Sequence, residues 1–181
     1  MSYNFVPIAL PEEAAAVADF MLSEPWPFHN AHQKSTRAEC VRRYSKTPSS
    51  DEAYFWMTNA ADERIGYLKL FDLDDIADQG SPLFDLRIRS DHRGKGVGQI
   101  AVRWLSDYLF TQWPDLFHIQ GTTREDNIAM RKVFLKCNFA KEGHIRRTWN
   151  GVHAAVLYGL LREDWKSGQV TPVPWDDDPA V

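Results

Sequence analysis

The chain has 181 residues, of which 44% are hydrophobic and 25% charged, and these values are typical of one soluble globular domain. Its formal net charge of −4 argues against a general nucleic-acid binder, which would carry a basic excess. The two cysteines, Cys40 and Cys137, indicate neither a disulfide framework nor a zinc site, so a reducing cytoplasm is the expected compartment. No signal peptide and no apolar run of membrane-spanning length are apparent, which predicts no membrane partner.

The order of strand and helix patterns predicts a mixed α/β domain. In chain order we expect a strand (3–9), two helices (11–23 and 36–45), three strands (53–58, 64–72 and 83–89), a helix (99–112), a strand (116–121), a helix (126–137) and two strands (141–149 and 152–161). Thr36 and Glu39 have the capping-box spacing that starts a helix, and Asn150-Gly151 is a strong hairpin signal. The prolines after the last strand predict one domain over 1–165 followed by an extended tail over 166–181.

A glycine-rich run, Arg93-Gly94-Lys95-Gly96-Val97-Gly98, joins the strand at 83–89 to the helix at 99–112. Glycines let a backbone approach a ligand closely and adopt positive φ angles. The first amides of a helix lack intrahelical acceptors, so they can bind an anion. The run therefore predicts a site for a phosphorylated ligand.

Spacing excludes two common nucleotide loops. A P-loop needs Ser or Thr after its lysine, whereas Lys95 is followed by Gly96. The dinucleotide fingerprint needs the spacing G-x-G-x-x-G, whereas the three glycines here stand two residues apart and Gln99 follows.

The pattern [RQ]-x-x-G-x-[GA] does fit residues 93–98, and a second segment supports it. Asn127 and Ala129, followed by Val133-Phe134-Leu135-Lys136-Cys137-Asn138-Phe139, look like the companion signature of the GNAT N-acetyltransferase superfamily, which the sequence resembles over 3–165. The ending Tyr158-Gly159-Leu160-Leu161-Arg162-Glu163-Asp164-Trp165 is similar to the branch that contains ribosomal-protein N-terminal acetyltransferases. The resemblance implies the GNAT fold, a mixed and mostly antiparallel sheet of about seven strands flanked by about four helices.

The resemblance also implies an activity, direct transfer of the acetyl group of acetyl-CoA to a primary amine, without a metal. The attacking amine must be neutral, and the thioester carbonyl must be polarised because its oxygen gains negative charge. The expected partner is a small-molecule amine or a peptide N-terminus, with polyamines and aminoglycoside-like compounds among the candidates. The exposed C-terminal hairpin could support a homodimer, which the sequence leaves open.

In the family, the loop amides and cations bind the coenzyme pyrophosphate, and the end of the preceding strand pairs with the pantetheine arm. The resemblance therefore implies a coenzyme site made of Leu86, Ile88, Arg89, Arg93, Gly94, Lys95, Gly96, Val97, Gly98, Asn127 and Phe134. Three of these residues have alternative roles, because the two loop cations could simply lie on the surface and the asparagine could merely cap a helix.

The chain departs from the family pattern at two positions. Phe134 stands where many members have a tyrosine proposed to protonate the leaving thiolate, and a phenyl ring cannot do so. Asn138 replaces the usual glycine, which is tolerable because asparagine also accepts positive φ at a helix end.

The acceptor side is assigned from residue chemistry. Asp85 is the first candidate for a general base because an acid in an apolar strand beside the loop is unusual, although a salt bridge with Arg87 or Arg147 would also explain it. The two prolines in residues 24–30 exclude a regular helix and predict a loop that carries large aromatics. We expect three side chains of this loop to contact the acceptor: Trp26, Phe28 and His29. For His29, and for His32 shortly after it, a surface location is the alternative.

Two further hypotheses stay open. Transfer of another acyl group, such as succinyl, would use cations beyond the loop: Arg87, Arg89, Arg146 and Arg147. A coenzyme-binding module without catalysis would explain Phe134. The acidic segment 72–78 would suit a cationic acceptor if it lined the site, and a solvated loop is its other interpretation.

Overall fold

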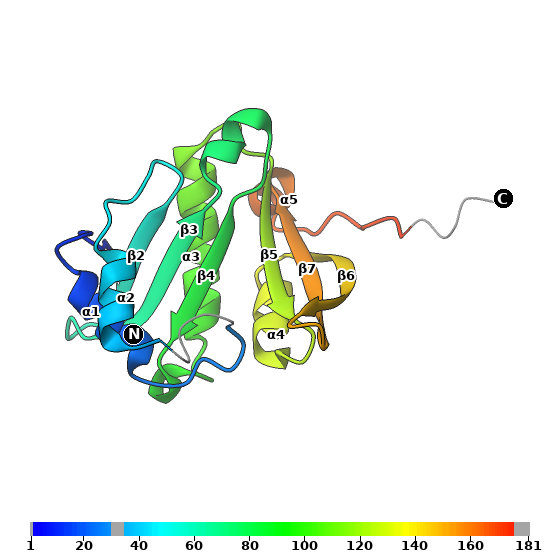
Figure 1. Cartoon of the computed structure of the whole chain (residues 1–181). Coiled ribbons are helices and arrows are strands. Elements are labelled where there is room, and N and C mark those ends of the chain that lie inside the picture. The colour runs from blue at the N-terminus through cyan, green and yellow to red at the C-terminus, as the bar shows by residue number, and fades with distance from the viewer. Residues whose placement is uncertain (1, 30–34, 176–181) are drawn as a thin grey trace.

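Two antiparallel sheets lie side by side and part from each other along β4 and β5 (Figure 1). The computed structural model describes residues 2–29 and 35–175. The first sheet has the strand order β1-β2-β3-β4 and the second has the order β5-β7-β6. In chain order the elements of the described part are β1 (Asn4–Pro7), α1 (Ala14–Leu22), α2 (Arg37–Tyr44), β2 (Ala53–Thr58), β3 (Arg64–Phe71), η1 (Asp74–Asp78), β4 (Leu83–Ile88), η2 (Ser90–His92), α3 (Val97–Gln112), β5 (His118–Arg124), α4 (Ile128–Lys136), β6 (Ala140–Trp149), β7 (His153–Leu161) and α5 (Arg162–Ser167).

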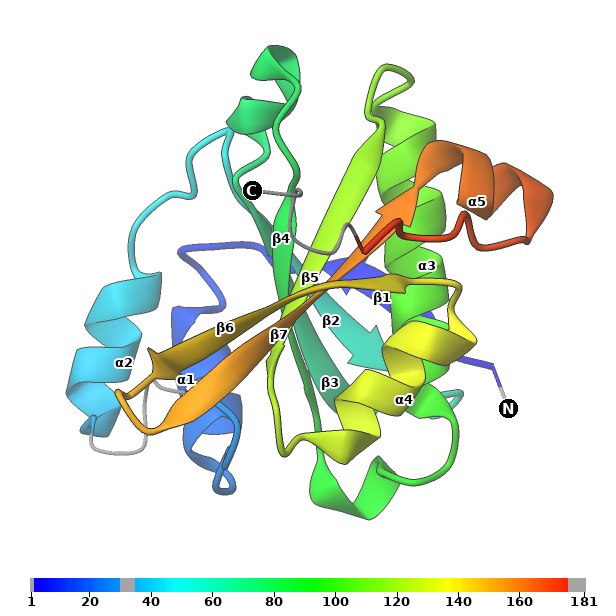
Figure 2. The same ribbon diagram turned by 90° about the vertical axis from the view of Figure 1, so that its right-hand side faces the viewer.

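Helices cover both faces of the four-stranded sheet (Figure 2). On one face lie α1 and α2, and Val17 of α1 joins Trp56 and Tyr67 of the sheet in one apolar cluster. On the other face lies α3, whose Leu105 joins Leu68 of β3 in the main core. Because each helix buries an apolar stripe against the sheet, the middle strands are apolar on both faces. The predicted α/β class and its seven strands are confirmed.

In the part of the chain that the structure describes, the two sheets are joined closely at one end. Near the start of β4 and β5, the Gln120 amide donates to the Pro82 carbonyl at 3.3 Å. Beyond this point the described strands form no ladder with each other, and Figure 1 shows β4 and β5 separating toward their carboxyl ends. The family resemblance implied one mixed sheet, whereas the structure divides it in two at this seam. One edge of β4 therefore keeps backbone groups that need partners.

Local sequence rules account for several boundaries. The capping box is confirmed, since the Glu39 amide donates to Thr36 Oγ1 at 3.3 Å and the Thr36 amide donates to Glu39 Oε2 at 2.7 Å. Asn138 has φ 64° just beyond α4, as expected for an asparagine that replaces glycine. Helix α3 begins two residues earlier than predicted, directly after Gly96, whose φ of 81° starts the helix.

Helix α5 is absent from the sequence-based expectation. It spans the position at which we divided the domain from its tail, and buried Asp164 accepts hydrogen bonds from the amide and hydroxyl of Thr171 at 2.9 and 2.6 Å. The first part of the predicted tail is thus bound to the domain, and the division at residue 165 stays a prediction.

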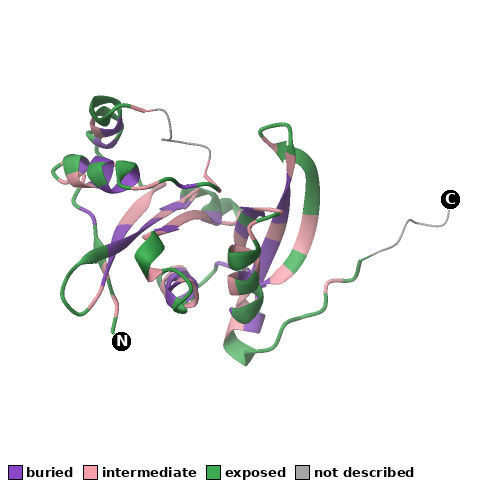
Figure 3. Cartoon of the chain, turned by 90° about the horizontal axis from the view of Figure 1, so that it is seen from below, coloured by how far each residue is buried: buried purple, intermediate pink, exposed green. Residues whose placement is uncertain are grey.

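The outer strand of the second sheet is open to solvent. None of the residues of β6 is buried, whereas β7 beside it is mostly buried (Figure 3). Within the described residues, none of the helices is both long and apolar enough to span a bilayer.

Phe134 of α4 packs into the main core. Its side chain is 1% exposed, and its ring stacks on Tyr158 with the centroids 4.7 Å apart. Gly121 of β5 lies against the same ring, so closely that a Cβ atom there would overlap it. A glycine at this position is therefore required for the helix to approach the sheet.

We expect Gly121→Ala to lower the free energy of unfolding by roughly 1–3 kcal/mol, because the new methyl group overpacks the core against Phe134. Gly143→Ala on β6 is the matched control, since its Cβ would lie 3.6 Å from Leu157, an ordinary contact. Urea denaturation compares the two variants. Equal stability of both would contradict this account of the packing.

Candidate functional site

A cavity of about 430 Å³ opens where β4 and β5 part. Four segments line it: the aromatic loop before α2, the end of β4, the glycine run with the start of α3, and one side of α4. Most residues predicted from the sequence meet here, namely Trp26, Phe28, His29, Leu86, Ile88, Arg93, Gly94, Gly96, Val97, Gly98 and Asn127. The expected coenzyme loop and the expected acceptor loop therefore share one cavity.

The start of α3 is built to receive an anion. Gly94 and Gly96 have φ angles of 73° and 81°, as the sequence predicted. Gly96 provides no side chain to cap α3, so the Val97 and Gly98 amides have no capping acceptor, whereas the Gln99 amide donates to the Gly96 carbonyl at 3.0 Å. At Gly98 a Cβ would stand 3.2 Å from Val133 of α4, so this glycine lets the two helices approach closely. Helix dipole and free amides together favour a phosphate group here.

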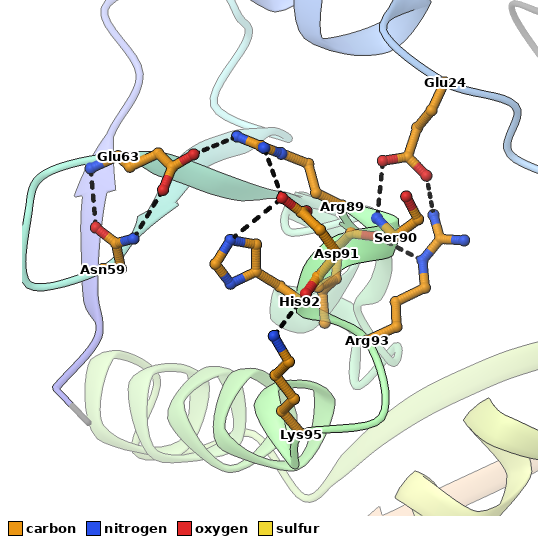
Figure 4. Close-up of polar contacts among 10 residues, drawn as sticks. Glu24, Asn59, Glu63, Arg89, Ser90, Asp91, His92, Arg93 and Lys95 are labelled. Atoms are coloured by element: carbon orange, nitrogen blue, oxygen red, sulfur yellow. Dashed lines mark hydrogen bonds and ion pairs between the residues drawn. The ribbon is translucent and has the colours of Figure 1, made fainter.

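The two loop cations are engaged within the protein (Figure 4). Arg93 donates from Nη2 to Glu24 at 2.7 Å and from Nε to the Ile88 carbonyl at 2.7 Å. Lys95 donates to the Asp91 carbonyl at 2.8 Å and does not line the cavity as described. Both cations are exposed on the surface, as the alternative for them had it, and their hydrogen bonds tie them to the loop and its surroundings.

Arg89 lies away from the cavity. Its guanidinium pairs with Glu63 at 2.6 Å and with Asp91 at 2.7 Å, on the side of β4 that faces the β2–β3 turn (Figure 4). Its side chain is thus committed to structural ion pairs. Phe134 is likewise outside the lining, since it packs in the core.

Asn127 caps α4, which is the alternative given for it, and its contact with the coenzyme stays a prediction. Its Oδ1 accepts a hydrogen bond from the Met130 amide at 3.2 Å and so caps α4. Its Nδ2 donates to Thr123 Oγ1 at 3.0 Å, and the residue also lines the cavity. The cap fixes the direction of α4 and hence the wall of the cavity.

Sequence reasoning missed the contribution of α4 beyond Asn127. Its lining side chains include Lys132 and Lys136, which stand one helical turn apart. A lysine pair at i, i+4 beside the apolar residues Ala129 and Val133 was the available signal. These lysines face the glycine run and add positive charge to the cavity.

Asp85 forms the centre of a polar cluster on β4. Arg87 donates from Nη2 to Oδ2 at 2.8 Å and from Nε to both carboxylate oxygens, and its side chain is only 2% exposed. His29 Nε2 lies 3.0 Å from Oδ1. Burial alone would raise the pKa of Asp85, but the His29 hydrogen bond and the Arg87 charge outweigh it and hold the pKa well below its usual range.

The contacts of Asp85 argue against its expected role as the general base. The salt bridge with Arg87, which we gave as the alternative for Asp85, is present. A carboxylate with so little affinity for protons is a poor proton acceptor, because efficient base catalysis needs a pKa near the working pH. Asp85 is also outside the described lining, although both of its partners, His29 and Arg87, belong to it.

Two other expectations concern the surroundings. The acidic segment lies in and around η1, at the end of the molecule opposite the glycine run, and none of its described residues lines the cavity (Figure 1). His32 lies outside the described residues, as does the end of the tail. In the described part, no group of His, Cys, Asp and Glu side chains is arranged to hold a metal ion.

Comparisons with known proteins place the chain by sequence and by fold. Residues 7–140 match the family model described as acetyltransferase (GNAT) domain. The chain is 30% identical over 142 residues to the probable N-acetyltransferase YjcK of Bacillus subtilis, covering 76% of this chain and 71% of the relative. The fold is similar to a chimera of the Vibrio cholerae spermidine N-acetyltransferase, with TM-score 0.78, 19% identity, and coverage of 92% of this chain and 99% of the other. The Vibrio cholerae enzyme in complex with CoA and spermine matches with TM-score 0.74 and 20% identity, covering 91% of this chain and 98% of that one.

We expect Asp85→Asn to lower the free energy of unfolding at pH 7 by about 3 kcal/mol, because buried Arg87 would lose its counter-charge. The folded pKa of Asp85 lies below its ordinary value of 3.8, so its stabilisation is present above pH 3.8 and is lost as the pH falls further. Urea denaturation from pH 7 down to pH 2 measures both effects.

The matched control is Asp19→Asn, which breaks an ion pair with Arg37 in which both side chains are more than half exposed. Such a pair contributes little to stability. An Asp85→Asn protein as stable as this control would contradict the assignment of a buried ion pair.

Proposed function

Because this chain belongs to the GNAT acetyltransferase family, we propose that it transfers the acetyl group of acetyl-CoA directly to the primary amine of a small acceptor. One observation carries the proposal: a single cavity joins the glycine run at the start of α3 to the aromatic loop that bears Trp26, Phe28 and His29. Donor and acceptor can thus meet without a covalent enzyme intermediate.

The electrostatics of the cavity suit the coenzyme. The net charge of the whole chain is −4, yet the described lining contains cations and not one carboxylate. Lys132 and Lys136 of α4 face the amides at the start of α3, and phosphate groups placed between them would meet positive potential from both sides. We assign the pyrophosphate to Gly94–Gly98, with Arg93 holding the loop in shape.

The open edge of β4 suits the pantetheine arm. Leu86 and Ile88 pair with Leu68 and Gly66 of β3 along one edge, while the opposite edge faces the gap toward β5. Amide groups of pantetheine can complete this edge as an added strand would. A backbone amide at this edge would also polarise the thioester carbonyl as negative charge develops on its oxygen.

The leaving thiolate must obtain a proton without help from Phe134. The phenyl ring has no proton to give and is buried in the core. The hydroxyl of Tyr158, on which Phe134 stacks, is near Arg131 Nε at 3.2 Å and is not part of the described lining. We infer that the thiolate leaves without a tyrosine acid and takes its proton from the attacking nitrogen or from solvent.

The acyl group is best explained as acetyl. Four arginines were candidates to bind the free carboxylate of a succinyl group. Of these, Arg87 is paired with Asp85, and Arg89 is paired with Glu63 and Asp91. The other two, Arg146 and Arg147, lie on β6 and are not part of the described lining. Succinyl transfer therefore has no support in the geometry of the described residues.

The acceptor is a small amine whose chemistry the names of the similar proteins do not decide. Two similar structures are spermidine acetyltransferases by name, one of them bound to spermine. A polyamine carries several positive charges, whereas the charged residues of the described lining are all cationic. A peptide N-terminus, as in the ribosomal-protein branch, stays a prediction, as do the cytoplasmic location and a homodimer.

We expect the protein to bind CoA in calorimetry and to release free thiol from acetyl-CoA when a suitable primary amine is added. Spermidine, aromatic monoamines, aminoglycosides and short peptides make the amine panel. CoA binding without thiol release from any amine would favour a non-catalytic coenzyme-binding module. No CoA binding at all would refute the coenzyme site.

We expect Lys132→Glu to raise the dissociation constant of CoA about tenfold, because a charge-assisted contact to phosphate is replaced by repulsion. Lys166→Glu on α5 is the matched control, since it makes the same change of charge on an exposed lysine outside the described lining. Calorimetry at two salt concentrations measures both variants. Equal weakening by both would show a general charge effect and would contradict this placement of the phosphates.

A further inference from the structure

His29 is held in the cavity from two directions. Its amide donates to the Trp26 carbonyl at 3.0 Å, and its ring lies edge-on to the Trp26 indole with the centroids 6.3 Å apart. From the other side, Nε2 lies 3.0 Å from Asp85 Oδ1. The side chain is 26% exposed and forms part of the cavity lining. A loop histidine on a free surface would not be fixed in this way.

The pairing with Asp85 sets the protonation pattern of the ring. The pKa of Asp85 is held well below its usual range, so its carboxylate is ionised and can only accept hydrogen bonds. A neutral His29 therefore carries its proton on Nε2 and its lone pair on Nδ1. Nδ1 is buried and has no hydrogen-bond partner in the described part of the chain. A buried acceptor without a partner requires an explanation, and an incoming N–H group supplies one.

We propose that His29 is the catalytic base that takes the proton from the acceptor ammonium, and that Asp85 is the residue that positions it. This inference rests on the proposed acetyl transfer. It exchanges the roles that residue chemistry alone predicted, in which Asp85 was the base and His29 a contact for the acceptor. Arg87 completes the arrangement, because its buried guanidinium keeps Asp85 ionised and fixed.

The proton balance of the reaction is complete with one base. The acceptor ammonium gives a proton to His29 Nδ1, directly or through one water molecule, and becomes a neutral amine. The amine nitrogen forms a bond to the thioester carbon, and the carbon–sulfur bond then breaks to release the thiolate. The second proton on nitrogen passes to the thiolate, which yields the amide and CoA, and His29 releases its proton to solvent.

Few other charged or titratable groups face this pair in the described structure. Arg87 approaches from β4, and its guanidinium and that of Arg93 lie over the Trp26 ring. Tyr44 of α2 and Tyr67 of β3 act electrostatically on Asp85, and burial raises the pKa of both tyrosines, which therefore stay neutral. His29, held by Asp85, is therefore the group that we assign as proton acceptor on this side of the cavity.

The test compares the pH dependence of turnover in wild-type protein and His29→Gln. Glutamine can still donate to Asp85 but cannot take up a proton. We expect kcat to fall by roughly a hundredfold or more, while CoA affinity stays unchanged. In the variant, the rate at acidic pH should no longer follow the wild-type profile. It should instead rise with pH as the acceptor amine loses its own proton. His153→Gln, a change outside the described lining, should leave rate and profile as they are.

Wild-type thiol release together with a wild-type profile in His29→Gln would overturn the inference and leave the proposed function intact. Absence of thiol release in the wild-type protein would overturn both.

Nitrogen NMR of the His29 ring gives a readout independent of turnover. We expect the neutral ring to show the Nε2–H form and its signals to change in Asp85→Asn. Ring signals that do not respond to Asp85→Asn would refute the pairing, and if that variant does not fold, a ring in the Nδ1–H form in wild-type protein would refute it equally.

Discussion

The unpaired edge of β4 is the constraint on which the rest of the site depends. A strand normally satisfies its amides and carbonyls on both sides, and a buried edge without partners is costly. Here β4 pairs with β3 on one side, while its contact with β5 is limited to the end near Pro82 and Gln120. The separation of the strands creates the cavity and at the same time offers backbone groups to a ligand. The Ile88 carbonyl already accepts from Arg93 Nε at 2.7 Å, and the remaining groups of this edge are those proposed to pair with an amide-rich ligand.

Hydrogen bonds and cation–π contacts join the aromatic loop to the glycine run across the cavity. Glu24, at the start of the aromatic loop, accepts from Arg93 Nη2 at 2.7 Å and from the Ser90 amide at 2.8 Å (Figure 4). The Trp26 ring lies under guanidinium groups from β4 and from the glycine run, 5.7 and 5.3 Å from its centroid. Hydrogen bonds to ionised groups are among the stronger contacts, so the acceptor loop and the coenzyme loop hold each other in place. One network therefore sets the positions of the two loops that we propose for the donor and the acceptor.

Charge is distributed unevenly between the described cavity and the remainder of the chain. The acidic segment around η1 lies at the opposite end from the glycine run. The described lining carries two lysines of α4 together with Arg87 and Arg93, each of which is paired with a carboxylate. We expect the charge beside the cavity to act on a ligand there more strongly than the net charge of the whole chain. The position of Asp85 shows the same principle at shorter range, because its neighbours decide whether a carboxylate serves as a base or as a support.

The sequence by itself determined the order of the strands and of the helices other than α5, the cap of α2 and the glycine run, because these depend on neighbours a few residues apart. Thr36 with Glu39, Asn138 and Gly96 each behave as their local chemistry dictates. Only the tertiary structure decided which distant side chains meet. The partner of Asp85, the burial of Phe134 and the lysines of α4 in the cavity follow from how two sheets and four segments pack, and no local pattern specifies that packing. The glycine run behind the proposed donor site was therefore legible in the sequence, whereas the arrangement around the proposed acceptor depends on contacts between residues far apart in the chain.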